Sequence, residues 1–274
     1  MMARARSDDA FTPEGPIRSI TYRLLWAVID AFEKSSNACL YLAVGLLRQN
    51  DLRSASQTRW SRYAAPDESA EAGLEPWEQR LYFGVLKEGD RILLVGSGGG
   101  RDLLPFCARG YVVTGVELVP ALAAAARRHL DRNAMAATLI EAPIETADLP
   151  DSYDVVIFSA FVYAYIAGSR SRASMLERLR SHLSPGGRII LSYMEAVPRA
   201  RRGLRLTRLS GWMAGTDWTP EPEDTFSCGP SRLPFYERAL SSAGVRSELT
   251  AAGFRIVRDE AAGTRRAVVA IAGA

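Results

Sequence analysis

The chain has 274 residues, of which 47% are hydrophobic and 24% charged, and its formal net charge is only +3. These values are typical of a globular chain with room for one catalytic domain and added segments. The small net charge gives no overall positive potential that would attract nucleic acid. The three cysteines, Cys39, Cys107 and Cys228, lie far apart and suit neither a disulfide framework nor a zinc site. We therefore expect a reducing, cytoplasmic location and no bound metal.

The first part of the chain is predicted to be helical. The opening residues MMARARSDDAF lack the apolar core of a signal peptide. Residues 1–85 show no convincing strand, and Leu24, Leu25, Val28, Ile29 and Phe32 follow the spacing of a broad helical stripe. We expect a helical cap or lid over residues 1–85. Its apolar pieces, 20–32 and 39–47, are too short to span a bilayer, which leaves a peripheral membrane contact open.

The middle of the chain alternates strand-like and helix-like segments. Expected strands cover 91–95, 112–117, 138–141, 153–158 and 188–192, and expected helices cover 120–130 and 172–183. A helix ending near 248–253 and strands at 254–259 and 266–271 follow. This order predicts an α/β domain over residues 86–274, with a mostly parallel sheet and helices on both faces.

Residues 195–245 form an insertion that is too long for an ordinary connection in such a fold. Their aromatic side chains stand among prolines and charges. Long segments beside the carboxyl edge of a parallel sheet usually build the binding pocket. We expect this insertion, together with the N-terminal helices, to cap the site.

A glycine-rich loop, VGSGGGRD, follows the first predicted strand. Gly96, Gly98 and Gly100 give the pattern G-x-G-x-G, which lets backbone approach a ligand closely. The characteristic motif of a dinucleotide-binding fold is G-x-G-x-x-G, and in this sequence Arg101 occupies the position of its third glycine. This argues against an NAD-dependent oxidoreductase, which stays as an alternative. Pro105 would clash inside a helix, so the next helix is expected to start near Asp102, which can cap it.

Five landmarks in order carry a family resemblance: VGSGGGRD, VELVPALAAAA, DLPDSYDVVIFSA, LSPGGRIILS and LTAAGF. They resemble class I S-adenosylmethionine-dependent methyltransferases over roughly residues 85–195 and 245–274. The resemblance implies a Rossmann-like, seven-stranded sheet with one antiparallel strand, and S-adenosyl-L-methionine as cofactor. It also implies methyl transfer to an O, N or S atom of a small molecule. A pseudoenzyme that binds the cofactor or a partner without catalysing methyl transfer is an alternative that the sequence leaves open.

The resemblance also assigns the cofactor residues. Gly96, Ser97, Gly98, Gly99 and Gly100 would line the methionine and ribose portion, with Asp102 directly after them. Glu117 would bind the ribose hydroxyls, and Leu118, Ala142, Pro143 and Ile144 would contact the adenine. Ser159 and Ala160 would face the methyl group. The sequence departs from the family at Leu94 and Pro143, where acids are frequent, so Glu141 or Glu145 is an alternative adenine contact.

No residue stands out as a general base. Tyr63, Tyr163 and Tyr165 are the candidates for the catalytic or substrate-facing positions, with core packing as the alternative for each. The segment FSAFVYAY lacks the Asn/Asp-Pro-Pro-aromatic signature of nucleic-acid amino-methylating enzymes, so nucleic acid is a disfavoured partner. No acidic pair follows that strand, which argues against a divalent-metal type. The oligomeric state and the acceptor stay undetermined.

Overall fold

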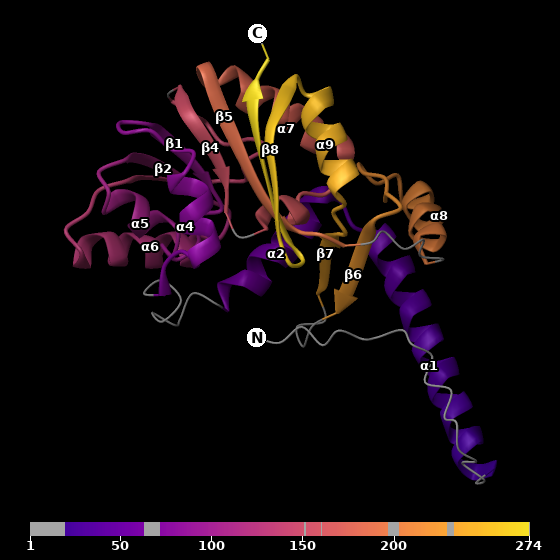
Figure 1. Ribbon diagram of the computed structural model, residues 1–274. Helices are drawn as coiled ribbons and strands as arrows, with labels where there is room; N and C mark the ends of the chain where they lie inside the picture. Colours follow the sequence, from indigo (N-terminus) through magenta and orange to yellow (C-terminus); the bar gives the residue numbers. More distant parts are fainter. Residues whose placement is uncertain are drawn as a thin grey trace.

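The computed structural model describes residues 20–62, 72–150, 152–159, 161–196, 203–228 and 233–273. Its centre is a seven-stranded sheet with the strand order β3-β2-β1-β4-β5-β9-β8 (Figure 1). The strands are β1 Arg91–Val95, β2 Val112–Glu117, β3 Thr138–Glu141, β4 Tyr153–Phe158, β5 Leu183–Met194, β8 Phe254–Ala262 and β9 Arg265–Ala272. Strands β1 to β5 pair in parallel, and β9 runs antiparallel to both of its neighbours. The predicted sheet is therefore confirmed, including its one antiparallel strand.

The predicted bounds of the first four strands are those observed, whereas β5 is longer than predicted. It begins at Leu183 instead of Arg188, because Leu183 already pairs with Tyr153. The register then shifts between Tyr153 and Val155, which accommodates the Ser-Pro-Gly-Gly turn within the strand. The helix expected at 172–183 spans Ser169–Ser181, and it ends before β5 begins at Leu183.

Helices cover both faces of the sheet, as alternation of strand side chains requires. In β1, Ile92 and Leu94 pack in one apolar cluster with α4 (Pro76–Phe83), α5 (Leu103–Cys107) and α6 (Pro120–Arg132). Leu93 and Val95 pack on the opposite face with α7 (Ser169–Ser181) and α9 (Ser242–Ala251). Both faces of the central strands are thus buried, so the carboxyl edge of the sheet is where a ligand can approach.

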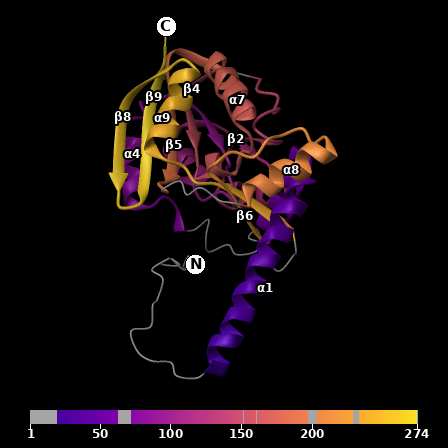
Figure 2. The same cartoon turned by 90° about the vertical axis from the view of Figure 1, so that its right-hand side faces the viewer.

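The remaining elements form a separate apolar cluster beside this edge. They are α1 (Ile20–Gly45), α2 (Gln49–Ser61), α8 (Leu204–Ala214) and the antiparallel pair β6 (Asp224–Cys228) and β7 (Pro234–Arg238). Tyr41, Leu52, Trp218, Phe226 and Tyr236 are among its buried members. The amino-terminal half of α1 extends away from the rest of the molecule in both views (Figures 1 and 2). Within the described ranges, no helix is both long and apolar enough to cross a membrane.

The glycine loop requires a glycine on the neighbouring strand β2. A Cβ at Gly115 would lie 2.8 Å from Cδ2 of Leu139 and 2.9 Å from Cβ of Ser97. We expect Gly115→Ala to destabilise the fold by about 1–3 kcal/mol, because the loop or the strand must move. Urea unfolding of the ligand-free protein measures this. Gly99→Ala is the control, since its Cβ would meet nothing closer than 3.8 Å. Equal stabilities for the two variants would refute the close packing of loop and strand.

Candidate active site

A cavity of about 260 Å³ lies at the carboxyl ends of β1 and β2. Nine residues singled out in the sequence line it: Gly96, Gly98, Glu117, Leu118, Ala142, Pro143, Ile144, Glu145 and Tyr165. Its surface is mainly apolar, and a few polar groups converge on it, which is the usual composition of a ligand site. In the described part of the chain, no cluster of His, Cys, Asp and Glu could hold a metal ion.

The glycine loop adopts backbone angles that side chains rarely allow. Gly96, Gly98 and Gly100 have φ values of +76°, +56° and +111°. A Cβ at Gly96 would lie 2.3 Å from Cγ2 of Val162, so this glycine brings the loop against the segment after β4. A Cβ at Gly98 would meet no atom within 4 Å. Because Gly98 lines the cavity, its missing side chain leaves backbone accessible to a ligand.

Glu117 connects this loop to the helix that follows β2. One carboxylate oxygen accepts the Gly98 N–H at 2.8 Å, and the other accepts the Val119 N–H at 2.9 Å. The side chain is buried yet lines the cavity. Burial raises the pKa of the Glu117 carboxyl above its ordinary value, although the backbone N–H donors oppose this effect. The residue thus presents acceptor oxygens to the cavity from a fixed position.

Six of the candidate residues do not line this cavity. They are Ser97, Gly99, Gly100, Asp102, Ser159 and Tyr163. The capping expectation for Asp102 is wrong, because its side chain makes no cap hydrogen bond to α5. Its buried carboxylate instead accepts the Ser159 hydroxyl and lies 2.6 Å from Nε of Arg101. Asp102 and Ser159 therefore join the ends of β1 and β4 below the loop.

Of the two tyrosine candidates that the structure describes, Tyr165 lines the cavity and Tyr163 does not. Tyr163 is fully buried, and its hydroxyl donates to Glu248 at 2.6 Å. Burial, together with the charge of Glu248, raises the pKa of Tyr163 well above its ordinary value. Tyr163 is thus directed into a buried network instead of toward the cavity. Tyr63 and Ala160 lie outside the described residues.

The N-terminal helices were expected to cap the site, but the residues of α2 that line the cavity were not identified from the sequence. Arg53, Ser56 and Trp60 line the cavity, and Gln57 donates to the carbonyl of Leu118 at 2.8 Å. These four positions have the i, i+3, i+4, i+7 spacing of one helix face. The signal was present in the sequence, since Trp60 is a large aromatic residue in a mostly polar helix. It could not be assigned a partner without the tertiary structure.

Three aromatic residues, Trp60, Tyr165 and Phe235, form a cluster that we call the aromatic wall; Trp60 and Tyr165 line the cavity, and Phe235 contacts both of them. The rings come from α2, the short 3-10 helix η1 (Val162–Tyr165) and β7. Their centroids lie 5.2 Å apart for Tyr165 and Phe235, 5.5 Å for Trp60 and Tyr165, and 6.1 Å for Trp60 and Phe235. The Arg59 guanidinium lies over the Phe235 ring at 3.8 Å. These tilted and edge-on ring contacts hold α2, η1 and β7 together.

The opposite end of the cavity is bounded by the loop after β3. Ala142, Pro143 and Ile144 lie there with Glu145, whose carboxylate pairs with Arg53 of α2 at 3.1 Å. Glu141 instead pairs with Arg127 at a more exposed position and does not line the cavity. Of the two glutamates considered as alternative adenine contacts, Glu145 is therefore the one at the cavity.

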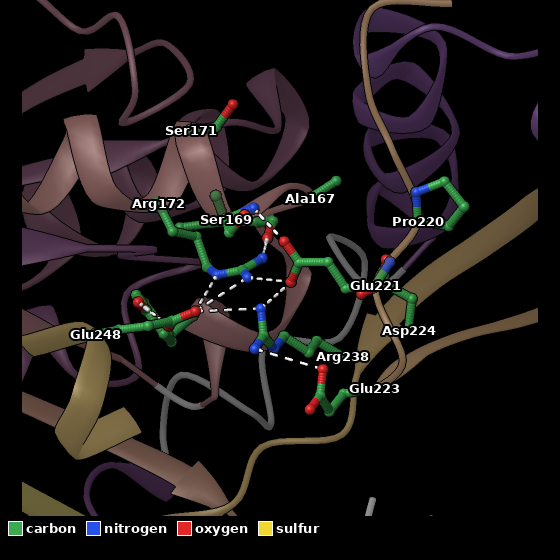
Figure 3. A network of polar contacts seen from close by, with 12 residues as sticks. Ala167, Ser169, Ser171, Arg172, Pro220, Glu221, Glu223, Asp224, Arg238 and Glu248 are labelled. Carbon is green, nitrogen blue, oxygen red and sulfur yellow. Dashed lines mark hydrogen bonds and ion pairs between the residues drawn. The ribbon is translucent and has the colours of Figure 1, made fainter. Parts of the chain in front are cut away.

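A buried ion network supports η1 from behind (Figure 3). Arg172 of α7 is fully buried and pairs with Glu221 at 2.6 Å and with Glu248 at 3.0 Å. It also donates to the carbonyl of Ile166, at 2.9 Å, directly after η1. Arg238 of β7 contacts the same two glutamates. The network thereby joins α7, α9 and the insertion to the segment that carries Tyr165.

The comparisons with known proteins agree with this geometry. Residues 92–187 match the family model described as a methyltransferase domain. This range contains the glycine loop, Glu117 and the segment through β4 and η1. The chain carries a class I, S-adenosylmethionine-dependent methyltransferase domain. The family resemblance read from the sequence is confirmed, and the chain is an enzyme of this class.

Solved structures share the fold of this methyltransferase domain. A methyltransferase from Methanosarcina mazei is 18% identical, with a TM-score of 0.56 over 73% of this chain and 99% of that one. The glycopeptide N-methyltransferase MtfA, solved with S-adenosylmethionine, is 19% identical, with a TM-score of 0.52 over 72% and 87%. The CcbJ methyltransferase from Streptomyces caelestis is 17% identical, with a TM-score of 0.54 over 76% and 91%. No curated protein matches the sequence.

The residues at the cavity fit S-adenosylmethionine, the cofactor of this class. The absent side chain of Gly98 leaves room for a close ligand, and the Glu117 carboxylate supplies acceptors for hydroxyl groups. An accessible backbone at Gly98 and a carboxylate at Glu117 are groups that an adenosine-containing ligand can use.

The ion network behind η1 should be essential for stability. We expect Arg172→Met to lower the free energy of unfolding by about 3 kcal/mol, because Glu221 and Glu248 lose a buried partner. The control is Arg170→Met on the exposed side of the same helix, with an expected change within about 0.5 kcal/mol. Denaturant unfolding of both variants gives the comparison. A similar loss of unfolding free energy in the two variants would show that the ion pairs of Arg172 do not stabilise the fold.

Proposed function

We propose that this enzyme transfers the methyl group of S-adenosylmethionine to an O, N or S atom of a small molecule that binds against the aromatic wall. The supporting observation is the continuity of the cavity. One and the same cavity is lined by Glu117 and Pro143 and by Trp60 and Tyr165. A donor and an acceptor can therefore share one site.

Within this proposal, the donor lies along the carboxyl ends of β1 and β2. Gly96 and Gly98 face its methionine and ribose, and Glu117 accepts hydrogen bonds from the ribose hydroxyls. Leu118 and Pro143, both at the cavity, hold the adenine, with Glu145 beside them. This leaves the η1 end of the cavity, with Val162, for the methyl group and the acceptor.

The chemistry needs little from the protein beyond placement. Bound S-adenosylmethionine supplies an electrophilic methyl group on a sulfonium, and its displacement leaves a neutral thioether. The chain must align the acceptor with that methyl group and exclude water. Trp60 from α2 and Tyr165 from η1 do this by closing the cavity from two sides. A general base is required only for an acceptor that must lose a proton first.

The acceptor is expected to be small, or the end of a larger molecule, with an apolar or planar part. Aromatic rings supply a large apolar surface with a preferred stacking geometry. Arg53, Glu117 and Glu145 are the charged residues at the cavity, and they lie on its donor side. The MtfA relative is named for transfer to nitrogen of a glycopeptide, which supports nitrogen as one of the three acceptor atoms.

Cofactor binding tests the assignment of Glu117. We expect Glu117→Gln to weaken S-adenosylmethionine binding by about 10–100-fold, because a charged acceptor for two hydroxyls is lost. Wild-type affinity should also fall as pH decreases, beginning at a higher pH than for an ordinary glutamate, since the pKa of Glu117 is raised. The glutamine variant should lack this step. Isothermal titration calorimetry across pH measures both effects.

Glu141→Gln is the matched control for that experiment. Glu141 pairs in register with Glu117 at the end of the neighbouring strand, but it faces Arg127 and not the cavity. Its substitution should leave affinity within about twofold, as for a surface change. Equal losses of affinity in the two variants would show that Glu117 does not bind the cofactor. A wild-type protein that binds neither S-adenosylmethionine nor S-adenosylhomocysteine would overturn the proposed function.

The aromatic wall is tested by two substitutions at Tyr165. We expect Tyr165→Ala to lower kcat/KM for the acceptor by about tenfold or more, because the ring surface is lost. Tyr165→Phe keeps the ring and should stay within about threefold. Release of S-adenosylhomocysteine with a panel of planar amines, phenols and thiols is the readout. A loss in the phenylalanine variant as large as in the alanine variant would instead assign the hydroxyl to proton transfer.

A further inference from the structure

The amino-terminal part of α1 presents apolar side chains to solvent. Ile20, Leu24, Leu25, Val28 and Phe32 are all exposed, and the exposed fraction of Phe32 reaches 74%. At about 100° per residue, these five positions and Ile29 fall within roughly half of the helix circumference. We call this half the apolar face of α1. It is far more extensive than isolated surface apolar residues, which need no explanation.

The apolar face lies on the side of α1 that is turned away from the rest of the chain. Where α1 packs against the body, Tyr41 and Val44 make the buried contacts. Extending their side of the helix toward the amino terminus leads to Arg23, Asp30 and Lys34. Extending the opposite side leads to the apolar face, which continues through the exposed Leu42. The described body of this chain therefore cannot cover it.

A second helix adds exposed apolar groups and positive charge. On α8, the buried residues are Leu204, Thr207, Ser210 and Gly211, and the exposed ones include Arg205, Arg208, Leu209, Trp212 and Met213. The two sets alternate with helical spacing, so the arginines and the large apolar side chains share the outward face. Trp212 is 81% exposed. No acidic residue occurs between Gly203 and Thr216.

Close packing fixes α8 against the body-side end of α1. The Thr207 hydroxyl donates to the carbonyl of Tyr41 at 2.8 Å, and a Cβ at Gly45 would lie 2.0 Å from Oγ of Ser210. Gly211 also approaches Gly45. The residues that follow these two glycines, Leu46 and Trp212, are both exposed. The outward face of α8 thus adjoins the end of the apolar face of α1, and the two helices are side by side in Figures 1 and 2.

We infer that α1 and α8 form a docking surface for an anionic lipid bilayer, on which α1 lies in the plane of the interface. Three observations favour lipid. The apolar face spans roughly 18 Å along α1, from Ile20 to Phe32. Trp212 on the outward face of α8 is exposed, and such an amphipathic ring prefers the headgroup region. Arg205 is exposed on the same face without an acidic neighbour on α8, where a lipid phosphate complements it, whereas the Arg208 guanidinium donates to the carbonyl of Pro220.

A second copy of the chain fits this surface less well. Two paired helices bury a narrow seam of a and d positions, and the flanking positions are polar. In α1, Ile20, Leu24 and Ile29 widen the apolar face well beyond such a seam. A bilayer surface accommodates this breadth, because an interfacial helix buries its whole apolar side.

The test is co-sedimentation of the full chain with vesicles of phosphatidylcholine and phosphatidylserine at a 7:3 ratio, and with pure phosphatidylcholine. We expect the protein to bind the mixed vesicles, and to bind the pure phosphatidylcholine vesicles with an affinity several-fold lower. Phe32→Ser should lower the affinity about tenfold through lost apolar burial. Arg205→Gln should lower it about fivefold on anionic vesicles only. Asn37→Ser, on the polar side of α1, is the control and should bind as the wild type does.

Thermal unfolding of each variant shows that the fold is retained, since Phe32 and Arg205 are exposed. Light scattering after size exclusion gives the oligomeric state. No binding to either vesicle would overturn the inference. So would a dimer that Phe32→Ser dissociates in a protein that does not bind vesicles, because the apolar face would then pair with a second copy. Equal binding to neutral and anionic vesicles would refute the role of Arg205. None of these results depends on methyl transfer.

Discussion

The site depends on one buried carboxylate, that of Glu117. It lies at the end of β2 and accepts backbone N–H groups from Gly98 of the loop and Val119 before α6. The loop itself uses positive φ angles that only glycine adopts at low cost. Backbone in such a conformation needs a fixed partner, and Glu117 supplies it. Glu117 also lines the cavity, so the residue that holds the loop is at the same time part of the ligand site.

The other side of the cavity is assembled from distant parts of the chain. The face of α2 with Arg53 and Trp60 meets η1 and β7, and Phe235 contacts both Trp60 and Tyr165. A buried network through Arg172 and Arg238 then connects these elements to α7 and α9 (Figure 3). The insertion contributes a ring to the wall and charges to the network. The glycine loop and Glu117 lie within the range that matches the methyltransferase family model, whereas α2 and β7 lie outside it.

The core of the fold could be predicted because its signals are local. Continuous apolar strands and a glycine loop fix the parallel sheet and the site at its edge, and four strands match their predicted bounds. The limits of prediction appear where a side chain has two competing partners. Asp102 was expected to cap α5, but the Ser159 hydroxyl and Arg101 engage its carboxylate. Such a choice depends on the distance between the ends of β1 and β4, which the sequence does not encode locally.

The tyrosines of η1 show the same limit. Tyr163 and Tyr165 were equivalent candidates, yet the turn of a short helix directs Tyr163 to Glu248 and Tyr165 to the cavity. Trp60 was missed because its partners, Tyr165 and Phe235, are far away in sequence. The apolar stripe of α1 was predicted from its periodicity, but periodicity alone assigns such a stripe to a core. Only the structure shows that Phe32 and its neighbours face outward.

The measurement that tests the central claim most directly is a crystal structure with S-adenosylhomocysteine. The account predicts that the ribose hydroxyls lie within hydrogen-bond distance of the Glu117 carboxylate. The adenine would lie between Leu118 and Pro143, and the sulfur would point toward Trp60 and Tyr165. A ligand whose ribose lies away from Glu117, or whose sulfur points away from the aromatic wall, would contradict it.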